Sequence, residues 1–156
     1  MNKKIKVIIF AYGFMGKYAY ESFFEDKNFL VEGIILPKKN TLYFSSLNKT
    51  KIKKNTKILE SDNKNKVFNF IKKISPNLVI ISTFNKILDK RFLKLSNFIN
   101  IHHGKLPKQK GRASINWAII MGRKSIYLTI HKVVLKLDAG QIIYQKKINI
   151  TPLDNY

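Results

Sequence analysis

The chain has 156 residues, 45% of them hydrophobic and 25% charged, which is ordinary for one folded globular domain and unlike a disordered chain. It contains no cysteine, so disulfides and cysteine-based zinc sites are excluded. The net charge is +21. Because only three of the 30 basic residues are arginine, while lysine, asparagine and isoleucine abound, we interpret this charge as compositional drift, with a nucleic-acid surface as the alternative.

The sequence shows no segment for membrane insertion. Its longest apolar run near the start, Val7 to Tyr12, is far shorter than the roughly 20 residues of a membrane-spanning helix. The basic start is not followed by a signal-peptide pattern with a cleavage site. We therefore expect a cytoplasmic protein.

The first half of the sequence alternates between apolar β-branched runs and helical patterns. The first helix is expected to be amphipathic, with Tyr18, Ser22 and Phe23 at helical spacing, and residues 38–55 read as a polar loop region. The elements expected here, in chain order, are a strand over 4–10, a helix to about residue 24, strands over 30–36 and 56–59, a helix over 65–74 and a strand over 78–81.

The second half continues the alternation and then changes to consecutive strands. The helix near residue 114 is expected to turn Ile115, Ala118 and Ile119 inward, with Trp117 packing against the sheet, and Asp138-Ala139-Gly140 forms the last turn. The elements expected here are a short helix over 89–95, a strand over 98–102, a helix over 114–121 and strands over 126–135 and 141–150.

Strands that alternate with helices predict right-handed crossovers and a parallel sheet, whereas two strands joined by a short turn are antiparallel. The expected fold is therefore α/β: a Rossmann-like, mostly parallel twisted sheet with helices on both faces and an antiparallel C-terminal strand pair. We expect one domain over residues 1–156. Such sheets bind ligands at the carboxyl ends of their strands, which directs attention to the residues that follow each strand.

After the first strand, Gly13 and Gly16 form a Gly-x-x-Gly pattern. This pattern is a fragment of a dinucleotide-binding fingerprint that lacks the third glycine. It fits either a tight strand-to-helix turn or a loop that contacts an acceptor substrate.

Asn100 and His102 end the strand over 98–102 and point to the same face, because side chains in a strand alternate. Both can donate a hydrogen bond to an oxyanion, and histidine can also move a proton near neutral pH. The pair fits a hydrogen-bonded turn cluster as well as a catalytic pair. His103 points to the opposite face and is expected to be structural or acceptor-facing, and His131 to be a core or surface residue.

Asp138 is the only acidic residue between Asp89 and Asp154, in a stretch rich in lysine. It fits an ordinary turn aspartate that caps its own backbone. It equally fits a carboxylate that orients an imidazole and accepts a proton from an amine.

Together, Asn100-x-His102, Leu106-Pro107, Gly111 and Leu137-Asp138-x-Gly140 resemble the active-site signature of the folate-dependent formyltransferases. Within that family the likeness is to nucleotide amino-sugar enzymes, such as the UDP-4-amino-4-deoxy-L-arabinose formyltransferase. It is carried by three further stretches: Phe10-Ala11-Tyr12-x-x-Met15-Gly16, Gly111-Arg112-Ala113-x-x-Asn116-Trp117 and Thr129-Ile130-His131. The Gly-Thr-Pro that methionyl-tRNA formyltransferases carry after the first strand is missing.

The resemblance implies a catalytic triad of Asn100, His102 and Asp138 and a formyl donor, 10-formyltetrahydrofolate, with no metal. It also implies folate contacts, largely through the backbone, which fall on Ile87, Leu88, Asp89, Arg112, Val134, Leu135, Lys136 and Leu137.

The chain departs from the family pattern at Gly104-Lys105, where Ser-Leu is common, and at Gln109-Lys110, where Tyr-Arg is common. It also ends where relatives continue, so we expect the C-terminal part of the family fold to be missing.

The resemblance implies transfer of a formyl group to a primary amine, with a nucleotide-linked amino sugar, a small molecule, as the expected acceptor. Three alternatives remain open: methionyl-tRNA as the acceptor, a non-catalytic folate- or nucleotide-binding remnant of the family, and a nucleic-acid-binding protein without enzymatic activity.

Overall fold

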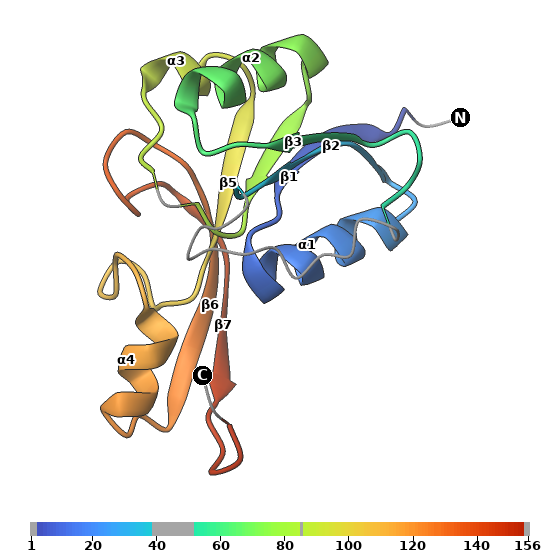
Figure 1. Cartoon of the computed structure of the whole chain (residues 1–156). Coiled ribbons are helices and arrows are strands. Elements are labelled where there is room, and N and C mark those ends of the chain that lie inside the picture. Colours follow the sequence, from blue (N-terminus) through green and yellow to red (C-terminus); the bar gives the residue numbers. More distant parts are fainter. Residues whose placement is uncertain (1–2, 39–51, 85, 155–156) are drawn as a thin grey trace. The chain divides into compact units, whose positions relative to one another are not determined.

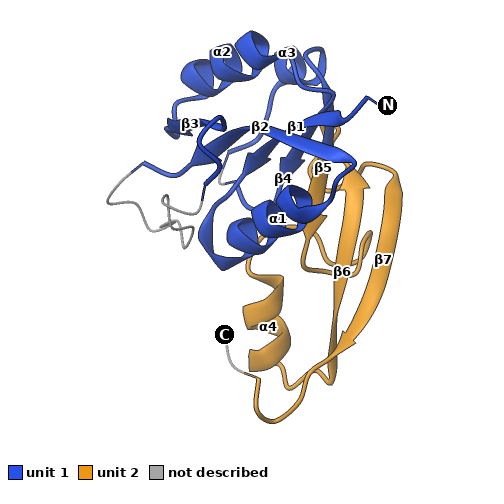
Figure 2. Cartoon of the chain, turned by 90° about the vertical axis from the view of Figure 1, so that its right-hand side faces the viewer, with its two compact units in different colours: residues 1–98 blue, residues 99–156 orange. Residues whose placement is uncertain are grey.

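The computed structural model describes residues 3–38, 52–84 and 86–154. The chain divides into two compact units, unit 1 over Met1–Phe98 and unit 2 over Ile99–Tyr156, coloured separately in Figure 2. The predicted loop over 38–55 lies largely outside the described residues. The prediction of a single domain stays a prediction.

Unit 1 is built on a parallel sheet whose strand order is β3-β2-β1-β4. Its strands are β1 (Ile5–Phe10), β2 (Phe29–Leu36), β3 (Lys57–Glu60) and β4 (Leu78–Ile81). Side chains along the second halves of β1 and β2 and along β4 are buried on both faces, which explains the unbroken apolar runs in the sequence. The four predicted strands are confirmed, with ends that differ by one residue at most places.

The helices of unit 1 cover both faces of this sheet: α1 (Gly13–Glu25) lies on one side, and α2 (Lys64–Ile74) and α3 (Lys90–Leu93) lie on the other (Figures 1 and 2). The side chain of Asn63 begins α2 by accepting hydrogen bonds from the backbone N–H groups of Asn65 and Lys66. Val67, Ile71 and Ile74 form its buried stripe. This pattern follows the period of 3.6 residues that predicted the helix.

The buried face of α1 differs from the predicted one. Tyr18 is 56% exposed, and Ser22 is exposed as well. The helix instead buries Gly16, Ala19 and Tyr20. Small residues allow the helix to approach the sheet closely, and the spacing of Tyr18 and Ser22 pointed to the wrong face.

The Gly-x-x-Gly loop has a structural explanation. Gly13 has a φ of +60°, which favours glycine. A Cβ on Gly16 would lie 2.3 Å from the backbone carbonyl carbon of Ala11, so only glycine lets α1 begin this close to the end of β1. These two requirements support the tight strand-to-helix turn.

Unit 2 is built on antiparallel strands in the order β5-β6-β7. Its elements are β5 (Asn97–His102, whose first two residues belong to unit 1), α4 (Ser114–Ile120), β6 (Ser125–Lys132) and β7 (Ile142–Asn149). The parallel sheet, the helices on both of its faces and the antiparallel C-terminal pair confirm the predicted fold class. Figure 1 shows α4 beside β6.

Two expectations in unit 2 are wrong. Trp117 is 57% exposed, so it does not pack against the sheet, and α4 buries Ala118 instead. The strand predicted over 126–135 ends at Lys132, whose backbone N–H donates to the Gln141 carbonyl and closes the β6–β7 pairing. The apolar residues that follow therefore lie in a loop.

No helix within the described ranges is long and apolar enough to cross a membrane.

Candidate active site

β5 and β6 place four polar side chains in register. Asn100 pairs with His131, and His102 pairs with Thr129. Residues two apart on a strand share a face, and paired residues on neighbouring strands share it too. The face that carries the predicted pair Asn100 and His102 therefore also carries two side chains of β6, Thr129 and His131. His102, Thr129 and His131 are all buried.

The loop between β6 and β7 adds Asp138 to this cluster. Asp138 has a φ of +46°, a left-handed conformation that aspartate tolerates better than most residues. Gly140 follows in contact with β6, where a Cβ would overlap the Lys132 carbonyl oxygen. This close approach fixes the turn and directs the carboxylate of Asp138, only 7% exposed, toward the two strands.

The Asp138 carboxylate lies between two imidazoles. Its Oδ2 is 3.8 Å from His102 Nδ1, and its Oδ1 is 3.6 Å from His131 Nε2. Oδ2 also accepts a hydrogen bond of 2.8 Å from the backbone N–H of Gly111. Asn100, His102 and Asp138, predicted from positions far apart in the sequence, thus belong to one cluster within unit 2.

These contacts keep Asp138 ionised. Burial acts to raise the pKa of its carboxyl, but the adjacent His131 imidazole, the Gly111 N–H and the His102 imidazole together outweigh burial and lower it. A carboxylate at neutral pH can orient an imidazole or receive a proton.

The loop after β5 closes over His102. The Nε2 of His102 lies 2.6 Å from the backbone carbonyl oxygen of Gln109, and a carbonyl can only accept, so Nε2 carries a hydrogen. Gly104 makes room for this contact, because a Cβ there would lie 2.7 Å from both His102 Nε2 and the Gln109 oxygen. Gly104, which departs from the family pattern, thus leaves the space that the His102 imidazole needs in this position.

A buried threonine and a half-buried glutamine hold the same loop against the strands. Thr129 Oγ1 donates to the Gly104 carbonyl at 2.6 Å. Gln145, from β7, donates to Thr129 Oγ1 at 2.9 Å and to the Leu106 carbonyl at 3.2 Å. Lys105, the other departure, places its ammonium 4.8 Å from the centre of the Tyr127 ring.

The sequence reasoning missed the place of His131. This side chain is 2% exposed, and its Nε2 contacts both Asn100 and Asp138. The missed signal is the register of an antiparallel pair, since a histidine opposite Asn100 on β6 must share its face. His103 differs, because its Nε2 is buried without a hydrogen-bond partner. Burial, and then the neighbouring His102, lower the pKa of His103.

The residues implied to contact folate fall in both units, and each group is described by itself. In unit 1, Ile87 is exposed, Leu88 is buried, and Asp89 begins α3 by accepting from the Arg91 backbone N–H. In unit 2, the loop after β6 exposes three large apolar side chains close together in sequence, with Lys136 among them and Arg112 exposed on another loop. The three are Val134, Leu135 and Leu137.

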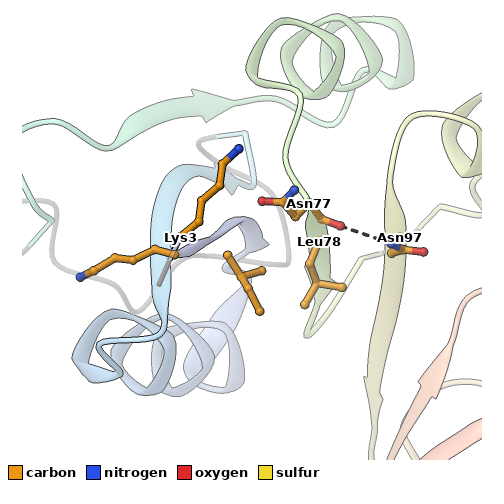
Figure 3. Close-up of a pocket in the computed structure, with 6 residues that line it drawn as sticks. Lys3, Asn77, Leu78 and Asn97 are labelled. Carbon is orange, nitrogen blue, oxygen red and sulfur yellow. Dashed lines mark hydrogen bonds between the residues drawn. The ribbon is translucent and has the colours of Figure 1, made fainter. Parts of the chain in front are cut away.

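One pocket of unit 1, of about 470 Å³, lies at the amino ends of its strands (Figure 3). It is lined by Lys3, Lys4, Ile5, Asn77, Leu78 and Asn97. Because α/β sheets bind ligands at the carboxyl ends of their strands, this pocket is not a candidate for the active site.

Among the described residues, no group of three histidine or acidic side chains has the arrangement of a metal site.

An α/β fold that gathers an amide, two imidazoles and a carboxylate in one buried cluster is typical of acid–base enzymes. The family model described as formyl transferase matches residues 37–156. The chain belongs to the formyl transferase family, as its motifs predicted.

Curated relatives span different members of this family. The methionyl-tRNA formyltransferase of Malacoplasma penetrans is 28% identical over 97% of this chain and 50% of its own length. The bifunctional polymyxin resistance protein ArnA of Wigglesworthia glossinidia brevipalpis is 30% identical over 96% of this chain and 24% of its own length. The chain thus spans half or less of these relatives.

Solved structures show the same fold. The phosphoribosylglycinamide formyltransferase of Bacillus halodurans superposes with a TM-score of 0.78 at 24% identity, covering 96% of this chain and 82% of its own. The enzyme from Campylobacter jejuni gives a TM-score of 0.77 at 23% identity and covers 99% of this chain.

Proposed function

We propose that this chain transfers a formyl group from 10-formyltetrahydrofolate to a primary amine, with Asn100, His102 and Asp138 as the catalytic residues. The observation that carries the proposal is the cluster in unit 2, in which a buried carboxylate lies 3.8 Å from the His102 imidazole and Asn100 lies two residues away on the same strand. Family membership supports the same reaction.

In the proposed reaction, the neutral amine attacks the formyl carbon and forms a carbon–nitrogen bond. Negative charge develops on the formyl oxygen, which receives hydrogen bonds from the amide of Asn100 and from His102. The amine proton passes to Asp138, directly or through water. The carbon–nitrogen bond to the folate then breaks, its nitrogen takes up the proton that Asp138 received, and tetrahydrofolate leaves as a neutral secondary amine. Loss of one such oxyanion donor typically lowers kcat by about 10²–10³-fold.

The contact between His102 and Gln109 sets a condition on this reaction. The Nε2–H of His102 donates to the Gln109 carbonyl, so a formyl oxygen has to replace that carbonyl to receive the hydrogen bond. The loop over residues 104–111 must therefore shift as the formyl group binds. This loop is held at its first part by Thr129 and Gln145. Gln109 is tied to Lys105 through its side-chain oxygen and its backbone N–H, so the shift has to move these two residues together or break their contacts.

We assign folate binding in unit 2 to Arg112 and to residues 134–137. Exposed apolar side chains gathered on one loop favour a ligand surface over a solvated turn, and Val134, Leu135 and Leu137 meet this condition. In unit 1, the proposed folate contacts are Ile87, which is exposed, and the backbone of buried Leu88 and of Asp89.

For the acceptor we propose the amino group of a nucleotide-linked sugar. The similarity to the ArnA protein over 96% of this chain supports it. Methionyl-tRNA is the second candidate, because the charge of +21 suits a polyanion and the Malacoplasma relative carries that name. Assaying both acceptors with formyl-folate, and following the gain of one formyl group by mass spectrometry, separates the two.

Replacing Asn100 by alanine should lower kcat by about 10²–10³-fold, because one oxyanion donor is lost. His102→Ala should lower it at least as much, since the variant loses a donor to the oxyanion and also the imidazole that lies beside the Asp138 carboxylate. The measurement is steady-state formyl transfer, with thermal unfolding to confirm that each variant is folded.

Asn97→Ala is the matched control for Asn100→Ala. It removes the same type of side chain from the other end of the same strand, where Asn97 is exposed. Its kcat should stay within about twofold of the parent value. Full activity in the Asn100 or His102 variant would refute the proposed mechanism.

A further inference from the structure

His131 uses both of its ring nitrogens. It lies on β6, and its Nδ1 is 2.9 Å from the Lys132 backbone carbonyl oxygen. Since a carbonyl oxygen can only accept, Nδ1 carries a hydrogen. In the neutral ring the other nitrogen, Nε2, then has a lone pair and accepts.

The Nε2 of His131 faces two groups with opposite requirements. The side-chain amide nitrogen of Asn100, a donor, lies 3.2 Å away. The Oδ1 of Asp138, an acceptor, lies 3.6 Å away. The neutral ring accepts from Asn100, whereas a ring protonated on both nitrogens would donate to Asp138 and could not hold the amide.

The other charged or titratable group at this ring is His102 on β5. The centres of the two imidazoles are 6.2 Å apart, with their planes at 80°. His102 therefore meets His131 edge-on and makes no hydrogen bond with it that would compete for Nε2. Asn100 is therefore the group that donates a hydrogen bond to the Nε2 lone pair of His131.

This contact fixes the orientation of the Asn100 amide. A side-chain amide can turn by half a rotation and exchange its oxygen for its NH₂ group, and a neighbour that only accepts selects the NH₂. One N–H then points to His131, and the second N–H is left to donate elsewhere. The opposite orientation would present the amide oxygen to a developing oxyanion and repel it.

We propose that His131 is a positioning residue for Asn100: its neutral Nε2 holds the amide so that the second N–H donates to the oxyanion. This inference rests on the proposed formyl transfer. His131 touches neither substrate in this scheme and acts through Asn100.

Two polar substitutions separate positioning from packing. In His131→Asn the side-chain amide reaches about as far as Nδ1, so it keeps the contact with Lys132 and loses Asn100. In His131→Gln it reaches about as far as Nε2 and can still accept from Asn100. We expect kcat to fall about 10–100-fold in the Asn variant, with the KM of either substrate changed by less than about threefold, and the Gln variant to recover kcat to within about threefold of the parent.

Lys132→Gln is the matched control, because it changes the neighbouring exposed side chain on the same strand and should leave kcat unchanged. Equal losses in the Asn and Gln variants, or unchanged kcat in the Asn variant, would overturn the proposal, since a purely structural role predicts no such difference.

A readout without turnover keeps this proposal distinct from the proposed function. In the ¹⁵N-labelled chain, the two side-chain NH₂ protons of Asn100 should have well-separated chemical shifts in the parent and in the Gln variant, because one is hydrogen-bonded. In the Asn variant the shifts should converge. If the parent transfers no formyl group, the proposed function fails, while this spectrum still decides whether His131 holds Asn100. Converged shifts in the parent would overturn the positioning itself.

Discussion

Asp138 combines an unusual backbone conformation with a buried charge. Its backbone has a φ of +46°, and its carboxylate lies between two imidazoles. The close approach of Gly140 to β6 holds the turn in this conformation. The carboxylate is stabilised by contacts that exist only in the folded chain, so its pKa is lowered on folding. A lowered carboxyl pKa makes stability depend on pH.

Replacing Asp138 by asparagine should remove part of the acid sensitivity of folding. The unfolded carboxyl titrates near pH ~3.9, and the folded one titrates lower. Its stabilising contribution is therefore fully present above the unfolded pKa and is lost as the pH falls through the folded pKa. Denaturant unfolding of the parent and the variant over acidic pH measures this effect. The difference in unfolding free energy between them should shrink as the pH falls.

Glu25→Gln is the control, because it removes one negative charge at an exposed position at the end of α1. Its difference from the parent should change less with pH than that of the Asp138 variant. An Asp138 variant whose difference stays constant over the same range would contradict the contacts described for the carboxylate.

Individual residues show how far the sequence led toward the site. Asn100, His102 and Asp138 were predicted from strand alternation, an isolated acid and motif resemblance, and their clustering in unit 2 is now seen. His131 was not predicted as a site residue because its partner in register, Asn100, lies 31 residues earlier, and no local pattern reports a cross-strand neighbour. Their catalytic roles stay predictions.

At the scale of elements, helix α1 shows why a helical pattern does not fix the buried face. The predicted spacing put Tyr18 on the helix's apolar face, whereas Gly16, Ala19 and Tyr20 are the residues buried. The decisive feature is the close approach of Gly16 to the Ala11 backbone, which leaves no room for a Cβ. Close packing of a helix on a strand depends on small residues as much as on large apolar ones.

Replacing Gly16 by alanine should destabilise unit 1 by about 1–3 kcal/mol or more, because the added methyl group overlaps backbone that cannot rotate away. Urea unfolding measures the change. Ser22→Ala, at an exposed position of the same helix, is the comparison and should be neutral or slightly stabilising, since alanine favours helices. An unaffected Gly16 variant would show that the strand-to-helix turn is looser than described.

The end of β6 illustrates a second limit of local patterns. Val133 to Leu135 continue the β-branched and apolar run, so the sequence predicted a longer strand. The chain leaves the sheet at Lys132 because that residue pairs with Gln141 and because Gly140 fits only against its carbonyl. The loop that results exposes the apolar side chains assigned here to folate binding.

At the scale of the whole molecule, the net charge of +21 bears on the acceptor. Unit 2 alone has eight lysines and two arginines against two aspartates. One aspartate is buried in the site, and the other is tied to Thr151. Such a surface attracts polyanions whatever the acceptor, so binding by itself does not identify the substrate.

Salt dependence discriminates between the acceptors. Binding to RNA should weaken steeply as salt rises from about 50 to about 200 mM, because each phosphate contact releases counterions. Turnover of a nucleotide-linked amino sugar should change little over the same range. Formyl transfer measured across this range checks the expectation. A turnover of the sugar as salt-sensitive as RNA binding would contradict the small-molecule acceptor.

The sequence by itself determined the strands, most of the helices, the α/β class and the residues of the expected triad, because alternation, periodicity and motif spacing are properties of neighbours along the chain. Only the tertiary structure decided that His131 joins Asn100 and Asp138, that Gly16 lies against the Ala11 backbone, and that β6 ends at Lys132. Each of these depends on cross-strand register or on backbone approach between distant residues, which no local pattern records.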